Sequence, residues 1–310
     1  MQLSSPNVAL MAHPTYEQSL MAAVDRLLVP CFAGVNLRGA RVVLKPNLIT
    51  TTNGHLSCTD GRLIEAAAAW FLTQGARVGV GDSPSFGSAR AVLAAIGALP
   101  RLQRLSVPIV EFRHKRPIKL PSGREAPLAT AALDCDFLVN LPKIKAHSQM
   151  RLTLAVKNYF GCVLGFHKPW WHMIHGGSHE PFARLLVDLL TVLPPGCSLV
   201  DGIMAMHGTG PIHGGPYPLG LLAAATNPVA VDTALLAVLG VDPRRCPLWL
   251  AAHGAGIRGT REEELSFTLL APGAFAVDDF IVPEELAPVR FNPVRFVKSS
   301  LQRALLRVLG

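Results

Sequence analysis

The stretch that decides the fold is F-L-V-N-L at residues 137–141, which runs directly into P-K-I-K-A-H at residues 142–147. A short, nearly continuous hydrophobic run of this kind is typical of a strand that is covered on both faces of a sheet. The segment that follows it contains Lys143, Lys145 and His147. The stretch therefore predicts a buried strand with charged side chains just beyond its carboxyl end.

Similar segments recur along the chain and alternate with segments of helical periodicity. Strands are expected at residues 8–11, 40–44, 77–80, 108–111, 137–141, 198–200 and 219–225. Helices are expected at residues 15–28, 62–73, 89–96, 153–160, 181–193 and 229–239, with Asp60 at the N-cap of the second. This alternation predicts an α/β fold, a mainly parallel mixed sheet covered by helices on both faces.

We expect residues 1–289 to form a single α/β domain, with two lobes that divide near residues 150–195 as the alternative. Residues 290–310 are expected to form a C-terminal basic amphipathic helix, because apolar residues recur there at three- and four-residue intervals between arginines and lysines. Such a helix can dock on the core or make a weak contact with a membrane surface, and both alternatives stay open.

Composition excludes several classes of protein. Half of the 310 residues are hydrophobic and 16% are charged, which excludes a disordered chain. The formal net charge of +8 is spread along the chain, so no nucleic-acid partner is expected. Its main local concentration before residue 290, residues 113–119, is expected to be a solvated hairpin or loop. The six cysteines are widely spaced and no signal peptide is visible, which predicts reduced thiols and a cytoplasmic location.

Polar side chains follow most of the expected strands within a few residues. In a parallel sheet the carboxyl ends of the strands lie at one edge, where ligands bind. This edge is expected to collect Lys45, Asn47, Asp82, Ser83, Lys143, Lys145, His147, Asp201 and Asn227, with Lys157 and Asn158 a helix length later. Lys143 and Lys145 are expected to point to opposite sides of the extended chain, so that one of them faces the ligand.

Ammonium, imidazole and amide groups together suit a phosphate or carboxylate ligand. Lys143, Lys145 and Lys157 would neutralise the anion, and His147 would act as acid or base. Aspartates 82, 201 and 232 could balance the lysines, accept protons or coordinate a divalent cation. The alternative for any one of these residues is an internal ion pair with no role in binding.

Five histidines between residues 147 and 179 indicate a second kind of site. Spacing of three or four residues, as between His172 and His175, can place two imidazoles on one helical face. His147 and His172 are the candidate metal ligands. The alternative is a tryptophan-rich lid around Trp170 and Trp171, whose histidines make ordinary hydrogen bonds.

Several motifs resemble the family called domain of unknown function 362. They are V-V-L-K-P-N-L at 42–48, G-D-S-P at 81–84, D-F-L-V-N-L-P-K-I-K-A-H at 136–147, L-T-L-A-V-K-N-Y-F-G at 152–161, V-D-G-I-M-A-M-H-G-T-G-P at 200–211 and N-P-V-A-V-D at 227–232. The family's motif positions fall on Lys45, Asn47, Asp82, Asn140, Lys143, Lys145, His147, Lys157, Asn158, Asp201 and Asp232. The order of His147, Lys157 and His172 is also similar to that in nickel-pincer lactate racemases, but no nickel site is inferred.

The resemblance implies a redox context, because family members are described as iron–sulfur-centre proteins and many carry a ferredoxin-like module. This chain has no closely spaced cysteines, so an iron–sulfur cluster is not carried over. We expect an enzyme, with oxidoreductase as its reaction class, that binds an anionic small molecule and can meet a redox partner protein. The alternative is a non-enzymatic electron-transfer or iron–sulfur and metal accessory protein.

Overall fold

The computed structural model describes residues 6–85, 87–164 and 179–287, which form the predicted α/β fold. Ten strands in these ranges make one mixed sheet, whose main path runs β12-β1-β11-β9-β6-β2-β3. The strands are β1 (Asn7–Ala12), β2 (Arg41–Pro46), β3 (Arg77–Val80), β6 (Phe137–Leu141), β7 (Lys143–His147), β8 (Arg151–Thr153), β9 (Ser198–His207), β10 (Gly215–Tyr217), β11 (Leu221–Ala225) and β12 (Ser266–Phe267).

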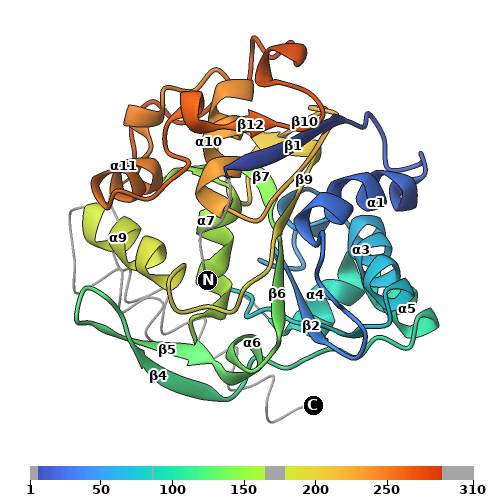
Figure 1. Cartoon of the computed structure of the whole chain (residues 1–310). Coiled ribbons are helices and arrows are strands. Elements are labelled where there is room, and N and C mark those ends of the chain that lie inside the picture. The colour runs from blue at the N-terminus through green and yellow to red at the C-terminus, as the bar shows by residue number, and fades with distance from the viewer. Residues whose placement is uncertain (1–5, 86, 165–178, 288–310) are drawn as a thin grey trace.

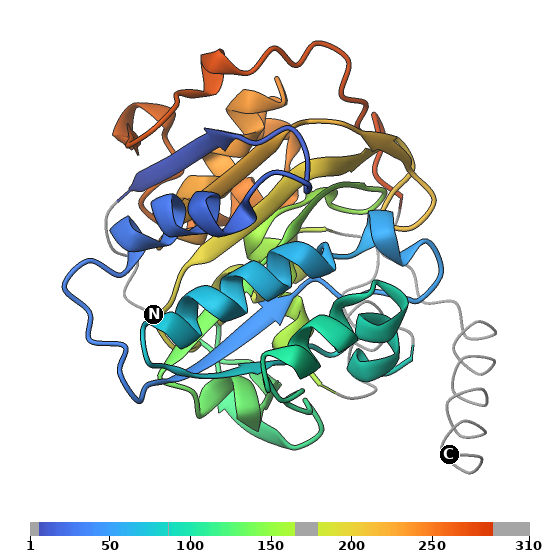
Figure 2. The same cartoon turned by 90° about the vertical axis from the view of Figure 1, so that its right-hand side faces the viewer.

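Helices cover both faces of this sheet (Figure 1). They are α1 (Leu20–Cys31), α2 (Gly54–Ser57), α3 (Gly61–Thr73), α4 (Ala89–Ala95), α5 (Ala98–Arg104), α6 (Thr130–Leu133), α7 (Ala155–Asn158), α9 (Glu180–Leu189), α10 (Pro228–Val238) and α11 (Pro247–Gly254). Figure 2 shows α1 and α3 side by side on one face, with α4 and α5 beside them. The opposite face carries α7, α9, α10 and α11 (Figure 1). Short 3₁₀ turns are η1 (Tyr159–Cys162), η2 (Pro243–Arg245), η3 (Glu262–Glu264) and η4 (Pro272–Ala274).

Strand direction decides where the polar side chains gather. β2, β3, β6 and β9 pair in parallel, so their carboxyl ends share one edge. β11 runs antiparallel to β9 and therefore ends at the opposite edge, whereas β1 runs antiparallel to β11 and so ends at the same edge as β9. Asn227, which follows β11, accordingly serves as the N-cap of α10, where it accepts hydrogen bonds from the backbone of Val229 and Ala230.

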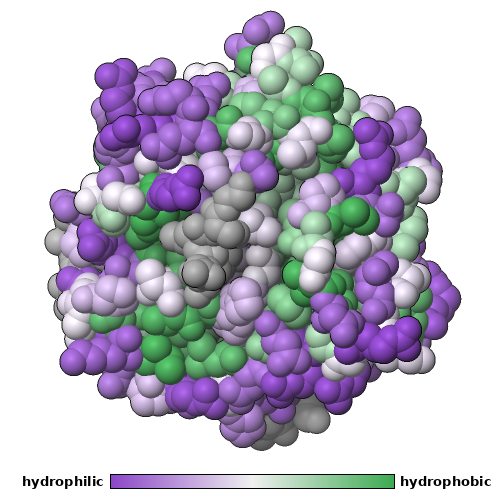
Figure 3. Space-filling view, in the orientation of Figure 1, coloured by the Kyte–Doolittle hydropathy of each residue, from purple (hydrophilic) through white to green (hydrophobic). Residues whose placement is uncertain are grey.

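Three hydrophobic clusters fill the space between the sheet and its helices. One cluster packs α1 and α3 against the sheet, and the other two lie beneath α9, α10 and α11. On the face shown in Figure 3, hydrophilic residues cover most of the outline. Hydrophobic residues gather nearer its middle, around α9 and the hairpin of β4 (Lys115–Lys119) and β5 (Glu125–Ala129). None of the helices in the described ranges is both long and apolar enough to cross a membrane.

Several predicted segments differ from the structure in length. The expected strand at 108–111 is reduced to a single bridge between Val80 and Ile109. The expected helix at 153–160 begins as β8, continues as the four-residue α7 and ends as η1. Residues 113–119 contribute β4 (Lys115–Lys119) to a hairpin with β5 (Glu125–Ala129), as predicted. The C-terminal helix expected at 290–310 lies outside the described residues.

Candidate functional site

The strand ends bring a group of buried polar side chains together, which we call the lysine site. It consists of Lys45, Asn47, Asp82, Asn140, Lys143, Lys145, Asn158 and Asp201, each less than a tenth exposed. Two strand registers place them: Lys45 lies opposite Asn140 across β2 and β6, and Lys143 lies opposite Asp201 across β7 and β9. Residues 143–147, expected to follow a strand, form strand β7 themselves.

Lys45 and Asp82 form a fully enclosed ion pair. The Lys45 Nζ lies 2.8 Å from Asp82 Oδ1 and donates a second bond to the Pro46 carbonyl. Asp82 also accepts hydrogen bonds from the backbone N–H groups of Leu48 and Ser83. Gly161 packs directly on the pair, and a Cβ at this position would overlap both charged groups. Ser83 contributes to the site through its backbone N–H, which donates to Asp82.

Lys143 forms a second buried pair, with a tyrosine between its partners. Its Nζ lies 3.0 Å from Asp201 Oδ2 and donates a 2.7 Å hydrogen bond to the Tyr16 hydroxyl. Tyr16 in turn donates to Asp201 Oδ1 at 2.6 Å, and Asp60 N–H donates to Asp201 Oδ2. Burial raises the pKa of Tyr16 well above its usual range, with a further contribution from the Asp201 charge. Lys45 and Lys143 thus form internal ion pairs, which was the alternative interpretation of these residues.

Lys145 differs because its partners are neutral. Its Nζ donates to Asn47 Oδ1 and, at 2.6 Å, to the carbonyl of Ser57. None of the described carboxylates lies within 4.0 Å of this nitrogen. Burial lowers the pKa of Lys145 to about 7, helped by repulsion from Lys157 and Lys143 and opposed by Cys58 and Asp82.

Both lysines of β7 reach the same segment of the chain. Lys145 bonds to Ser57, and the carboxylate that holds Lys143 accepts the N–H of Asp60. The expectation that they point to opposite sides was wrong, because residues two apart on a strand point to the same side.

Three asparagines join the strands of the site. Asn158 Oδ1 accepts a 2.6 Å hydrogen bond from the Asn47 side chain, and Asn158 Nδ2 donates to Asn140 Oδ1 at 2.8 Å. Asn140 donates in turn to the carbonyl of Ala155 and to the Ser198 hydroxyl. This chain of amides fixes α7, which carries Asn158, against β2 and β6.

Lys157 lies at the margin of the site, and His147 is the last residue of β7, two positions after Lys145. Lys157 is half-buried, and its Nζ lies 5.1 Å and 5.5 Å from the ring centroids of Phe160 and Phe182. His147 Nδ1 accepts hydrogen bonds from the backbone N–H groups of Gln149 and Met150. The neutral ring therefore carries its proton on Nε2.

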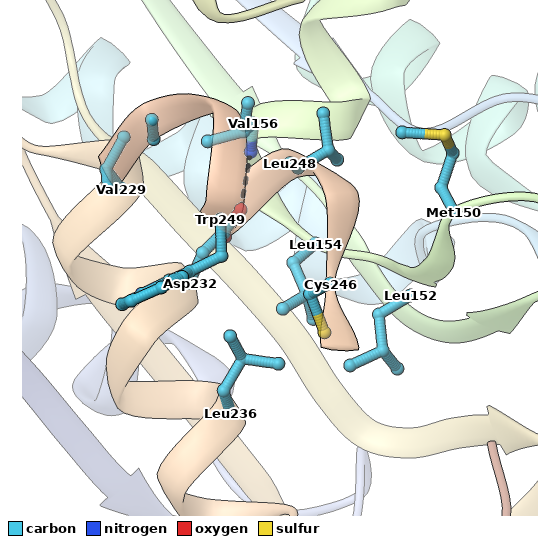
Figure 4. A pocket seen from close by; sticks show the side chains of 11 residues that line it. Met150, Leu152, Leu154, Val156, Val229, Asp232, Leu236, Cys246, Leu248 and Trp249 are labelled. Carbon is cyan, nitrogen blue, oxygen red and sulfur yellow. Dashed lines mark hydrogen bonds between the residues drawn. The ribbon is translucent and has the colours of Figure 1, made fainter. Parts of the chain in front are cut away.

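Asp232 contacts the backbone of α7 and no described lysine. Its two oxygens accept the N–H groups of Ala155 at 2.7 Å and Val156 at 3.0 Å. Figure 4 shows the carboxylate among apolar side chains, with the bond to Val156 drawn as a dashed line. Burial raises the pKa of Asp232 to about 7, although the two backbone donors lower it.

The described part of the chain contains no set of side chains that would form the predicted metal site. His172, Trp170 and Trp171 lie outside the described residues, as does the segment expected to form a lid. Within ranges 6–85, 87–164 and 179–287, no three histidine, cysteine, aspartate or glutamate side chains gather as metal ligands would. All six cysteines are free thiols.

Sequence reasoning missed three residues of the site. Tyr16 falls in a segment with helical periodicity, but the helix begins only at Leu20 and leaves Tyr16 in the preceding loop. Ser57 contributes a carbonyl oxygen, and Gly161 contributes the absence of a side chain. Residue type carries no signal for the last two, although Gly161 does belong to the motif at 152–161.

Comparison with known proteins identifies the family. The thylakoid-associated protein sll1697 of Synechocystis sp. is 39% identical over 306 residues, which cover 97% of this chain and 95% of that protein. Among solved structures, the lactate racemase apoprotein of Thermoanaerobacterium thermosaccharolyticum has a TM-score of 0.41 and 12% identity, covering 62% of this chain and 50% of that one. A Thermotoga maritima protein has a TM-score of 0.43 and 11% identity, with coverages of 67% and 56%. The family model described as "Domain of unknown function (DUF362)" matches residues 42–237, and the chain belongs to this family.

Proposed function

We propose that the protein is an enzyme that binds an anionic small molecule, a phosphate or a carboxylate, at the lysine site. The observation that carries the proposal is Lys145, a buried amine with neutral partners beside two further lysines. Lys45 and Lys143 are neutralised by Asp82 and Asp201, whereas the charge of Lys145 has no described carboxylate to balance it. An anion would supply that balance.

The same lysine suits proton transfer. An amine with a pKa of about 7 is present in both protonation states near neutral pH, so it can donate or accept a proton at little cost. Lys157 would meet the anion first, because it is the more exposed lysine at this edge. His147, with its proton on Nε2, would act as the second acid or base. Oxidoreductase is the reaction class we infer, from the redox modules of the family that the sequence resembles.

Titration calorimetry with inorganic phosphate, a phosphate monoester and a 2-oxo carboxylate tests the proposal. We expect at least one of them to bind, and Lys157→Gln to weaken its binding by at least about tenfold, because a lost charged hydrogen bond is worth about 1.5–3 kcal/mol. Lys119→Gln is the matched control, since Lys119 is an exposed lysine of the β4–β5 hairpin. Equal losses in the two variants, or no binding to the unaltered protein, would refute the proposal.

A second candidate function is attachment to a membrane surface. The observation that favours it is the relative that is 39% identical and is named for its association with thylakoids. The basic amphipathic pattern of residues 290–307 and the net charge of +8 would supply attraction to anionic lipids. We propose a cytoplasmic protein that reaches the membrane peripherally through this segment. It should sediment with phosphatidylglycerol vesicles at low salt, and sedimentation that persists after removal of residues 290–310 would refute this role for the segment.

A further inference from the structure

Asp232 lies outside the lysine site, at the N-terminal end of α7. Its carboxylate reaches from α10 and accepts the N–H groups of the first two residues of α7, Ala155 and Val156, one on each oxygen. These N–H groups have no partner within a helix of four residues, so Asp232 supplies the hydrogen bonds that the helix cannot make for itself.

The other end of α7 carries two residues of the proposed binding function. Lys157 and Asn158 are its last residues, and Asn158 bonds to the side chains of Asn47 and Asn140. A helix this short cannot hold its own position by backbone hydrogen bonding. Its placement therefore depends on contacts from outside the helix: the bonds of Asn47 and Asn140 to Asn158, the bond of Asn140 to the Ala155 carbonyl, and the two bonds from the first N–H groups to Asp232.

Asp232 lines a small, partly open cavity and is itself more than nine-tenths buried. The cavity measures about 20 Å³, enough for about one water molecule. Apolar side chains form its wall, among them Leu154, Leu236 and Trp249 (Figure 4). Cys246 is the other titratable side chain of this lining. Burial raises the pKa of Tyr159 of η1, with a small further contribution from the Asp232 charge. Because the carboxylate is largely withdrawn from water, the two backbone hydrogen bonds are the contacts that offset the free-energy cost of burying it here.

We propose that Asp232 is a positioning residue that anchors α7 and thereby places Lys157 and Asn158 at the lysine site. Both bonds have their full strength only with the ionised carboxylate, because protonation turns one oxygen into a hydroxyl donor that accepts weakly, and in asparagine that position is an NH₂ donor. Burial places the pKa of Asp232 at about 7, so the anchor is complete above neutral pH and weakened below it. The test of this inference by phosphate affinity rests on the proposed function, whereas its test by hydrogen–deuterium exchange does not.

Asp232→Asn tests the anchor, with Asp188→Asn as the matched control. Asp188 is also buried, but it lies on α9 and pairs with Arg184. In hydrogen–deuterium exchange at pH 8, the amides of residues 155–158 should exchange about tenfold faster in Asp232→Asn than in the unaltered protein, the loss expected for one hydrogen bond. The control should leave them unchanged. Equal exchange in all three proteins overturns the anchor.

Phosphate affinity tests the positioning. Asp232→Asn should weaken phosphate binding about fivefold at pH 8 and little at pH 6, where the unaltered carboxyl group is itself largely protonated. The same loss at both pH values would indicate a general structural defect and overturn the proposal. Faster exchange with unchanged affinity would overturn it as well.

Two further results separate this inference from other failures. If the unaltered protein binds none of the three anions, the proposed function fails, and the exchange experiment still decides the anchor; if it binds one other than phosphate, that anion replaces phosphate in the affinity test. If Asp232→Asn does not fold, the unaltered protein is compared with itself. After correction for intrinsic exchange rates, residues 155–158 should be about tenfold less protected at pH 6 than at pH 8, and equal protection overturns the anchor.

Discussion

Lys143 and Lys145 stand two residues apart on β7, point to the same side and are equally buried, yet their surroundings differ. Lys143 has a carboxylate partner, Asp201, and shares it with Tyr16. Lys145 meets an amide oxygen and a backbone carbonyl instead. Burial alone therefore does not distinguish the two lysines. What separates them is whether the protein already supplies the opposite charge.

Removing the amine of Lys143 should have the largest effect. Lys143→Met leaves the Asp201 carboxylate buried without its cation, and breaking one side of a buried ion pair costs about 4 kcal/mol. Urea denaturation at pH 7 measures the change in the free energy of unfolding. A loss below about 1 kcal/mol, the range of exposed ion pairs, would show that Asp201 does not need Lys143.

The second largest effect should be the contribution of Lys145 to the pH dependence of stability. Its folded pKa of about 7 lies below the usual value of 10.5, so between these values the unfolded chain holds a proton that the native protein lacks. Stability therefore rises with pH over this interval, by roughly 3 kcal/mol between pH 7 and pH 10. Lys145→Met should abolish this rise while staying within about 1 kcal/mol of the unaltered protein at pH 7. Denaturant titrations at several pH values compare the two, and equal slopes would contradict the low pKa.

The Lys45–Asp82 pair offers a steric test of how closed the site is. Gly161→Ala should destabilise the protein by about 2 kcal/mol, because the added methyl group overlaps both charges and overpacking has this cost. Gly254→Ala is the control: nothing lies within 4 Å of a Cβ there, so no loss is expected. Thermal unfolding of both variants gives the comparison. Equal midpoints would mean that the segment around Gly161 moves freely away from the pair.

Tyr16→Phe should have the smallest effect, and it shows how much of the Lys143–Asp201 contact depends on the tyrosine hydroxyl. The variant keeps the ring and removes the hydroxyl that joins Lys143 to Asp201, while the direct ion pair remains. The loss should be about 1 kcal/mol, the net value of a hydrogen bond. Urea denaturation measures it. A loss as large as that of Lys143→Met would show that the tyrosine, rather than the direct contact, holds the pair together.

Local patterns predicted most of the fold. The hydrophobic run at 137–141 is β6, and Asp60 is the N-cap of α3 as expected. The strand expected near Ile109 failed, because forming a strand depends on a neighbour with free backbone groups and β3 offers only one bridge there. Asn227 was grouped with the strand ends, but the antiparallel direction of β11 is set by tertiary pairing, which short-range periodicity does not contain.

The composition of the lysine site was predictable, but its pairing was not. Lys45, Lys143 and Lys145 were expected at one edge of the sheet, and they lie there. Which lysine meets a carboxylate depends on register, such as Lys143 opposite Asp201, and on loops such as the one that carries Tyr16. These contacts join residues far apart in the chain.

The pairing of Lys45 with Asn140 and of Lys143 with Asp201 across neighbouring strands has a consequence for how the chain finds its native alignment. If β2 or β7 slid by one position against its neighbour, every side chain would turn to the other surface, and the ammonium groups would enter the hydrocarbon packing beneath the helices. The misaligned sheet would then carry isolated charges with no counterion. The buried lysines thus destabilise misaligned pairings of the strands, independently of any ligand that they bind.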